Sequence, residues 1–148
     1  MRTTSPSARP PATAPEIAAR LRLTATRLAR RLRQESSAGL SPSQQSALAV
    51  IANHGPLTLG ALAEHERVAP PTITKVVSKL ECDGLVTRTP DPGDRRVCRV
   101  AISPAGEALL EETRRRKTAW LTARISQLDA DRQRRLADAL DVLDELIS

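Results

Sequence analysis

Apolar residues recur every three or four positions along most of the chain, a spacing that predicts amphipathic helices. The first such segment covers residues 16–38. Its apolar face is formed by Ile17, Leu21, Leu28 and Leu32. Residues 1–15 contain four prolines and show no apolar period, so we expect a disordered arm ahead of the first helix.

Residues that favour helix ends divide the rest of the chain. Ser, Thr or Asp at the N-cap, or Pro in the first turn, marks the start of a helix, and Gly marks its end. Such starts occur at Ser41, Thr58, the Pro70–Pro71 pair, Ser103 and Asp129. Glycines that close the preceding helices stand at Gly39, Gly55 and Gly84. The pattern therefore predicts six helices.

Between the fourth and fifth helices the apolar period shortens to two, which is typical of strands. Residues 85–89 and 97–102 are short β-prone runs, joined by the turn-rich and charged residues 90–96. We expect a two-stranded hairpin, or wing, with Arg95 and Arg96 at its tip. The predicted fold class is mainly α with a small β wing.

The first and last helices carry apolar faces that the middle of the chain does not need. The last helix has a stripe formed by Leu136, Leu140, Leu143 and Ile147. A compact winged domain of roughly 60–70 residues is complete without either helix, so their apolar faces need each other or a second chain. We expect a disordered arm (1–15), a dimerisation helix (16–38), a winged domain (39–103) and C-terminal dimerisation helices (104–148).

Composition excludes several classes of function. Trp120 is the only Phe, Tyr or Trp in the 148 residues, so the chain lacks the aromatic platforms on which single-stranded RNA or DNA usually stacks. The net charge of +6 still allows duplex DNA as a partner. Two cysteines, Cys82 and Cys98, fall short of a zinc framework, so we expect no metal and no cofactor.

No segment approaches the roughly 20 apolar residues that cross a bilayer, and the N-terminus lacks the apolar stretch of a secretory signal. We therefore expect a cytoplasmic protein without a membrane partner.

The fourth helix and the hairpin tip carry the candidate chemistry. The helix buries Ile73, Val76, Val77 and Leu80, which leaves a polar face without an acid before Glu81. Such a helix fits the major groove of DNA, and tip arginines suit the neighbouring minor groove. We expect Asp94 to pair with Arg96 and fix its orientation. The candidate DNA contacts are Pro71, Thr72, Thr74, Lys75, Ser78, Lys79, Asp94, Arg95 and Arg96.

Three stretches of sequence carry a family resemblance. They run from Val68 to Arg88, from Asp91 to Arg96 and from Val100 to Gly106. The first contains Leu-Glu-x-x-Gly-Leu-Val-x-Arg and the second Asp-Pro-x-Asp-x-Arg. Together they resemble the MarR (multiple antibiotic resistance regulator) family of bacterial transcription factors, and the likeness covers nearly the whole chain from Glu16 onward.

The resemblance implies a winged helix-turn-helix homodimer. In this family the N-terminal and last two helices interdigitate with those of the partner, recognition helices enter consecutive major grooves, and wing arginines enter flanking minor grooves. By position, Arg96 is similar to the family's wing-tip arginine and Asp94 to the acid that orients it. Arg88 lies where the strand commonly contacts or supports the DNA backbone, so it joins the candidate contacts.

The resemblance also implies a repressor that a small-molecule effector releases. Relatives bind such effectors in a crevice between the dimerisation helices and the winged domain, and here Arg27, Arg31 and Trp120 are the candidates to line it. Trp120 is, however, more typical of a core or interface anchor. The basic run 114–117 follows Glu111 and Glu112 at helical spacing, which favours a salt-bridged face over a DNA contact.

We expect a DNA-binding transcriptional regulator that is not an enzyme, because no nucleophile elbow, phosphate-binding loop or paired-carboxylate motif occurs. The expected partners are double-stranded DNA, a second copy of the chain and a small-molecule effector. The alternative is a helical adaptor that binds proteins through its long helices and recognises no DNA sequence.

Overall fold

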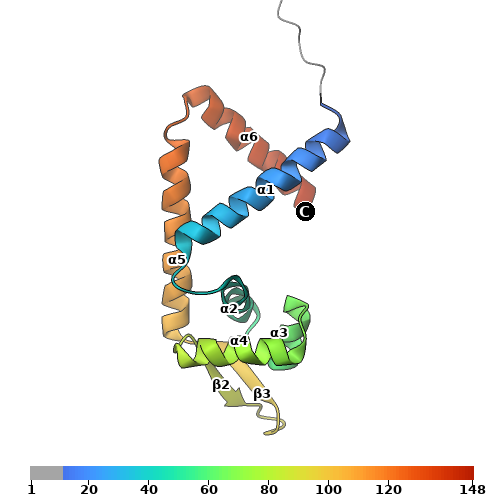
Figure 1. The fold of residues 1–148 in the computed structure, drawn as a ribbon, viewed down its shortest axis with the longest axis vertical. Helices are drawn as coiled ribbons and strands as arrows, with labels where there is room; N and C mark the ends of the chain where they lie inside the picture. The colour runs from blue at the N-terminus through green and yellow to red at the C-terminus, as the bar shows by residue number, and fades with distance from the viewer. Residues whose placement is uncertain (1–11) are drawn as a thin grey trace, which may run out of the picture.

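The computed structural model describes residues 12–148, so most of the predicted arm lies outside the described residues. In chain order the elements are α1 (Ala14–Ser36), α2 (Pro42–His54), β1 (Leu57–Thr58), α3 (Leu59–Glu66), α4 (Pro70–Cys82), β2 (Val86–Pro90), β3 (Cys98–Ile102), α5 (Pro104–Ile125) and α6 (Ala130–Ile147) (Figure 1). The mainly α fold with a small β wing is confirmed. Within residues 12–148, no helix has the length and apolar character needed to cross a membrane.

The first helix begins at Ala14, two residues before its predicted start at residue 16. Thr13 is the N-cap, and its N–H and hydroxyl both donate to the Glu16 carboxylate, at 2.8 and 2.9 Å. Pro15 lies in the first turn, where a missing N–H costs no helical hydrogen bond. The last proline assigned to the arm is therefore a helix-start residue.

The sheet has a third strand that the sequence did not predict. Leu57 and Thr58 pair antiparallel with Val100 and Arg99, which gives the strand order β1-β3-β2. Two residues are too few for an alternating pattern to be recognised. Through β1, the start of α3 is tied to the same sheet as the wing.

The hydrophobic core belongs to the winged part of the chain. All the buried apolar side chains fall between Ala47 and Val100, on α2, β1, α3, α4, the turn after α4, β2 and β3. Leu109 and Leu110 of α5 pack only against the edge of this core. Figure 1 shows the winged part as one body at the lower end of α5, with α6 leaving the upper end.

The first turn of α5 fixes this long helix to the winged domain. The Ser103 hydroxyl accepts the N–H of Gly106 at 3.1 Å, and the Ser103 N–H donates to the carbonyl of Leu85 at 3.0 Å. A Cβ placed on Gly106 would collide with the Leu85 carbonyl oxygen and lie 2.8 Å from Ile102 Cγ1. Only glycine lets α5 approach the turn between α4 and β2 so closely.

We therefore expect Gly106→Ala to lower the free energy of unfolding by about 1–3 kcal/mol, because the added methyl group forces α5 away from Leu85. Urea denaturation followed by circular dichroism measures the change. Gly60→Ala is the matched control, since the nearest atom to a Cβ there is 3.9 Å away. It should be neutral or stabilising by up to about 1 kcal/mol. Equal stability of Gly106→Ala and wild type would contradict the close approach.

Candidate nucleic-acid interface

α4 turns its apolar face to the core and its polar face to solvent. Ile73, Val77 and Leu80 are buried, and half-buried Val76 packs against the same core. The predicted contact residues on this helix are all exposed: Pro71, Thr72, Thr74, Lys75, Ser78 and Lys79. The Thr74 hydroxyl donates to the Pro70 carbonyl at 3.0 Å, so one of them already has a partner within the helix.

The predicted C-terminal cap of α4 is present and sets the direction of the wing. Gly84 has a φ of 73°, and the N–H of Leu85 donates to the Leu80 carbonyl at 2.9 Å. Buried Leu85 then leads directly into β2. The recognition helix and the wing are thus joined by a turn of fixed shape.

Asp94 organises the tip of the wing, as expected. Its carboxylate accepts the backbone N–H of Arg96 at 3.0 Å and guanidinium N–H groups of the same residue at 3.2 and 3.4 Å. These bonds, led by the one from the backbone, lower the pKa of Asp94. The carboxylate therefore stays ionised at neutral pH, and the wing loses this bracing only as the pH falls through that lowered pKa. The Arg96 side chain is 91% exposed, so it projects into solvent, while Asp94 holds one edge of its guanidinium group.

Asp91 is a wing residue that the sequence analysis missed. Its carboxylate accepts the N–H groups of Gly93 and Asp94 at 3.1 and 3.2 Å and forms an ion pair with Arg99 on β3. The hydrogen bond from Arg99 is the main reason why the pKa of Asp91 is lowered. Arg99 also reaches the carbonyl of Pro56 at 3.5 Å. Opposite charges on the two arms of a hairpin are the signal that could have indicated this pair.

Arg88 is engaged within the protein. From β2 its guanidinium donates to the Ser78 hydroxyl on α4 at 3.0 Å. Its Nε lies 2.8 Å from the Glu81 carboxylate, which makes an ion pair without an aligned hydrogen bond. Arg88 thus links the wing strand to the recognition helix and offsets the one acid on the outer part of that helix.

Every acid in residues 67–102, the segment with the predicted DNA contacts, has a basic partner. Residues 67–102 contain seven Lys or Arg and four Asp or Glu. The four acids form the pairs Glu81–Arg88, Asp83–Lys79, Asp91–Arg99 and Asp94–Arg96. Within the described part of the chain, three bases of this segment form no ion pair: Arg67, Lys75 and Arg95. The surface therefore presents positive charge and no unpaired carboxylate.

The remaining predicted residues fall into separate places. On α5, the Trp120 ring has two arginines near it: the Arg31 guanidinium of α1 lies 5.8 Å from its centroid and that of Arg124 of α5 lies 3.7 Å from it. The Trp120 side chain therefore lies where α5 meets α1. The basic run on α5 pairs with Glu111 and Glu112, which confirms its interpretation as a salt-bridged face. Across residues 12–148, no group of three or more His, Cys, Asp or Glu is placed to hold a metal ion.

A cavity of about 510 Å³ lies between α1, α2 and α5. Its lining includes Arg33, Lys117, Gln45 and Ser46, together with small apolar side chains. The predicted effector residues Arg27, Arg31 and Trp120 are not part of this lining. The assignment of Arg27, Arg31 and Trp120 to an effector site therefore stays a prediction.

Comparisons with known proteins agree with this geometry. The MarR family model matches residues 40–98. An uncharacterised HTH-type transcriptional regulator of Mycobacterium leprae is 42% identical over 132 residues, which are 88% of this chain and 92% of that protein. The chain belongs to the MarR family.

Solved structures of other regulators extend this assignment to the fold. A transcriptional regulator from Thermotoga maritima has a TM-score of 0.77 and 30% identity, over 88% of this chain and 93% of that one. A mutant of MepR from S. aureus, bound to an oligodeoxyribonucleotide, has a TM-score of 0.71 and 18% identity, over 89% and 98% of the two chains. As a MarR-family member, the chain is a DNA-binding transcriptional regulator with a winged helix-turn-helix.

The position of Arg88 gives a prediction that separates bracing from direct contact with DNA. Arg88→Ala should weaken duplex binding, because it leaves the Glu81 carboxylate facing the phosphates and frees α4 from β2. If bracing dominates, Glu81→Gln in the same chain should restore part of the lost affinity. Fluorescence anisotropy with a labelled duplex measures both variants and the double variant. A double variant as weak as Arg88→Ala alone would show that Arg88 acts on the DNA itself.

Proposed function

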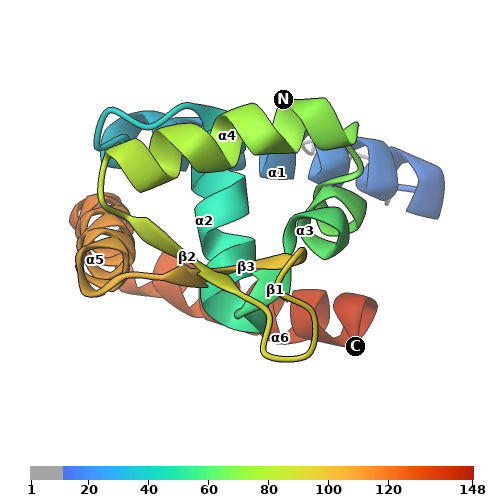
Figure 2. The ribbon, with the colours of Figure 1, turned by 90° about the horizontal axis from the view of Figure 1, so that it is seen from below.

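We propose that two copies of the chain bind one near-palindromic DNA site and repress transcription from it. In this arrangement α4 of each protomer enters a major groove and each wing enters a flanking minor groove. A two-fold axis would hold the recognition helices ~34 Å apart, which is one turn of duplex. Figure 2 supports a shared binding face, because α4 and the wing both border the side of the molecule that is seen from below.

The observation that carries this proposal is the uncovered apolar face of α6. No residue of this helix is buried in the single chain, and Leu140 and Ile147 are 53% and 83% exposed. Val142 and Leu146 are also exposed and make the apolar face wider than the predicted stripe. An amphipathic helix gains most of its stability from packing that face, so a second chain is the natural cover.

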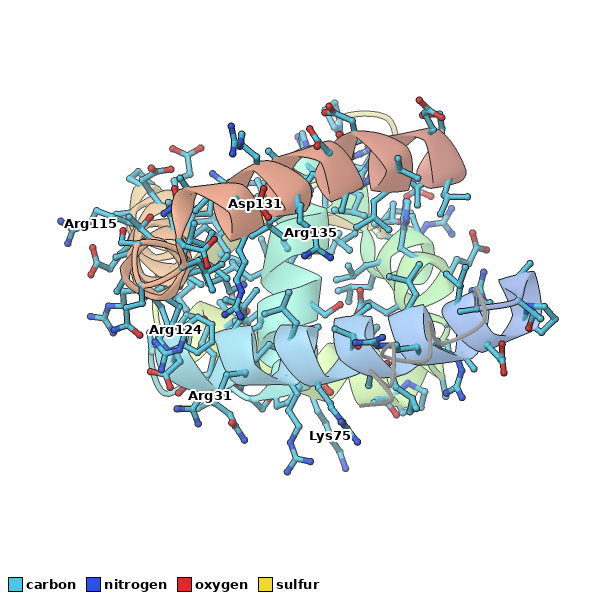
Figure 3. All side chains as sticks on the ribbon, turned by 90° about the horizontal axis from the view of Figure 1, so that it is seen from above. Arg31, Lys75, Arg115, Arg124, Asp131 and Arg135 are labelled. Carbon is cyan, nitrogen blue, oxygen red and sulfur yellow. The ribbon has the colours of Figure 1, made fainter. Side chains whose placement is uncertain are left out.

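The first helix supports the same arrangement. Ile17 and Leu28 of α1 are exposed, and Leu21 and Leu32 are only half-buried. Figure 3 shows α1 and α6 along two separate sides of the molecule, so their apolar faces do not cover each other within one chain. The homodimer predicted from the sequence remains the arrangement that would bury the predicted stripe of Leu136, Leu140, Leu143 and Ile147.

The cavity between α1, α2 and α5 supports release by a small anionic effector. Arg33 and Lys117 supply positive charge to its wall, and Gln45 and Ser46 supply hydrogen-bonding groups. Both α1 and α5 would also belong to the dimer contact. An anion that prefers one angle between these helices would shift the spacing of the recognition helices, which is the differential affinity that regulation requires.

Binding-site selection from a random duplex library tests the proposal. The expected product is a palindrome with half-sites one turn apart, bound with a steep salt dependence. Weak binding that is uniform across sequences and insensitive to salt would instead support the alternative, a helical adaptor without sequence-specific DNA binding.

Lys75→Ala on the selected site is the sharpest test of the recognition helix. Lys75 is exposed and has no acid partner among the described residues, so its loss should weaken binding by about 1–3 kcal/mol. Arg115→Ala on α5 is the matched control: it removes the same charge, and Glu112 keeps Arg116 as a partner. Anisotropy titrations measure both affinities. Equal losses in the two variants would mean that only net charge matters and that α4 does not occupy the groove.

A further inference from the structure

One residue other than glycine has a left-handed backbone in the described part of the chain. Arg67 ends α3 with φ 54° and ψ 44°, and its N–H donates to the carbonyl of Glu64 at 3.2 Å. The other two residues with positive φ, Gly39 and Gly84, are glycines. Glycine adopts this conformation without steric cost, whereas a side chain with a Cβ is strained there. Position 67 is therefore occupied by a residue that the backbone disfavours.

The positive charge of Arg67 also forms no ion pair within the described part of the chain. The four acids of residues 67–102 are all taken by other bases, and Arg67 forms no ion pair with a described residue. Its side chain is exposed. Neither packing nor pairing thus explains why an arginine stands where glycine would be more stable.

The position of Arg67 in the fold supplies the explanation. In a helix-turn-helix the first helix lies across the phosphate backbone and the second begins at the groove. Arg67 is the C-cap residue directly after this first helix, α3, and stands three residues before Pro70, where α4 starts. Figure 2 shows the turn from α3 into α4 at the edge of the face that carries α4 and the wing.

We infer that Arg67 binds a phosphate group of duplex DNA at the edge of the major groove that α4 enters. This inference rests on the proposed function and adds a contact that neither the wing nor the recognition helix supplies. Strained backbone that persists at a binding surface is a recognised sign of function gained at the expense of stability. Lys75 and Arg95 are the other two bases of residues 67–102 that form no ion pair with a described residue. The three bases are therefore the ones whose charge is available to phosphates.

The test compares Arg67→Gly, Arg67→Asn and Arg67→Lys on the duplex selected for wild type. Gly removes both the charge and the strain, Asn removes the charge and tolerates the left-handed conformation, and Lys keeps the charge. The affinity of each variant is measured from low to physiological salt, and the slope of log affinity against log salt is compared. Thermal unfolding of the same samples reports the strain.

Arg67→Gly should raise the Tm by about 2–4 °C while making the salt slope shallower by about 0.9 per protomer. Arg67→Asn should show the same shallower slope, and Arg67→Lys should retain the slope of wild type. A residue that merely supports the fold would lower the Tm when it is replaced. A raised Tm together with a shallower salt slope therefore indicates a contact with DNA.

An unchanged salt slope in Arg67→Gly and Arg67→Asn would overturn the phosphate contact. So would a slope in Arg67→Lys as shallow as that of Arg67→Gly, because the charge would then not be the cause. A wild-type protein that selects no duplex and shows no salt dependence would refute the proposed function itself, which keeps the two failures distinguishable.

Discussion

Hydrophobic burial in this chain is concentrated in the winged domain and stops at its edge. The buried apolar residues between Ala47 and Val100 hold α4, the sheet and α3 in one body, and Gly106 lets α5 dock on it. Beyond that contact, α6 runs on without burying a single side chain. Because exposed apolar helices are unstable in water, this division leaves a well-packed winged part and a terminal part whose apolar face the proposed second chain would cover.

The ion pairs of the winged domain depend on the same fixed arrangement of its helices and strands. Opposite charges can be placed two to eight residues apart and still meet, because the sheet and the α4 cap fix their positions. None of these pairs is fully buried, so each contributes little stability by itself. Their combined effect is on the character of the surface: within residues 67–102 each carboxylate has a basic partner, and Asp94 holds one edge of the arginine at the wing tip. The uncompensated charge is left to three bases, Arg67, Lys75 and Arg95.

The sequence predicted features that depend on near neighbours. The caps of α2, α5 and α6, the glycine cap of α4 and the Asp94–Arg96 pair all join residues within five positions. Features that join distant segments were missed or misplaced, because one sequence shows spacing but not register. These are β1 and the partners of Arg88. The left-handed turn at Arg67 was missed for another reason, since glycine is the usual signal for that conformation.

The proposed dimer is the feature that would both cover the exposed helix faces and set the spacing of the recognition helices. Sedimentation equilibrium of the wild-type protein, alone and with its selected duplex, tests it most directly. We predict a mass near 32 kDa, twice the 16.0 kDa of one chain, at micromolar concentration, and two chains on each duplex. A species of 16.0 kDa that binds the same duplex with full affinity would contradict the dimer and leave the apolar face of α6 unexplained.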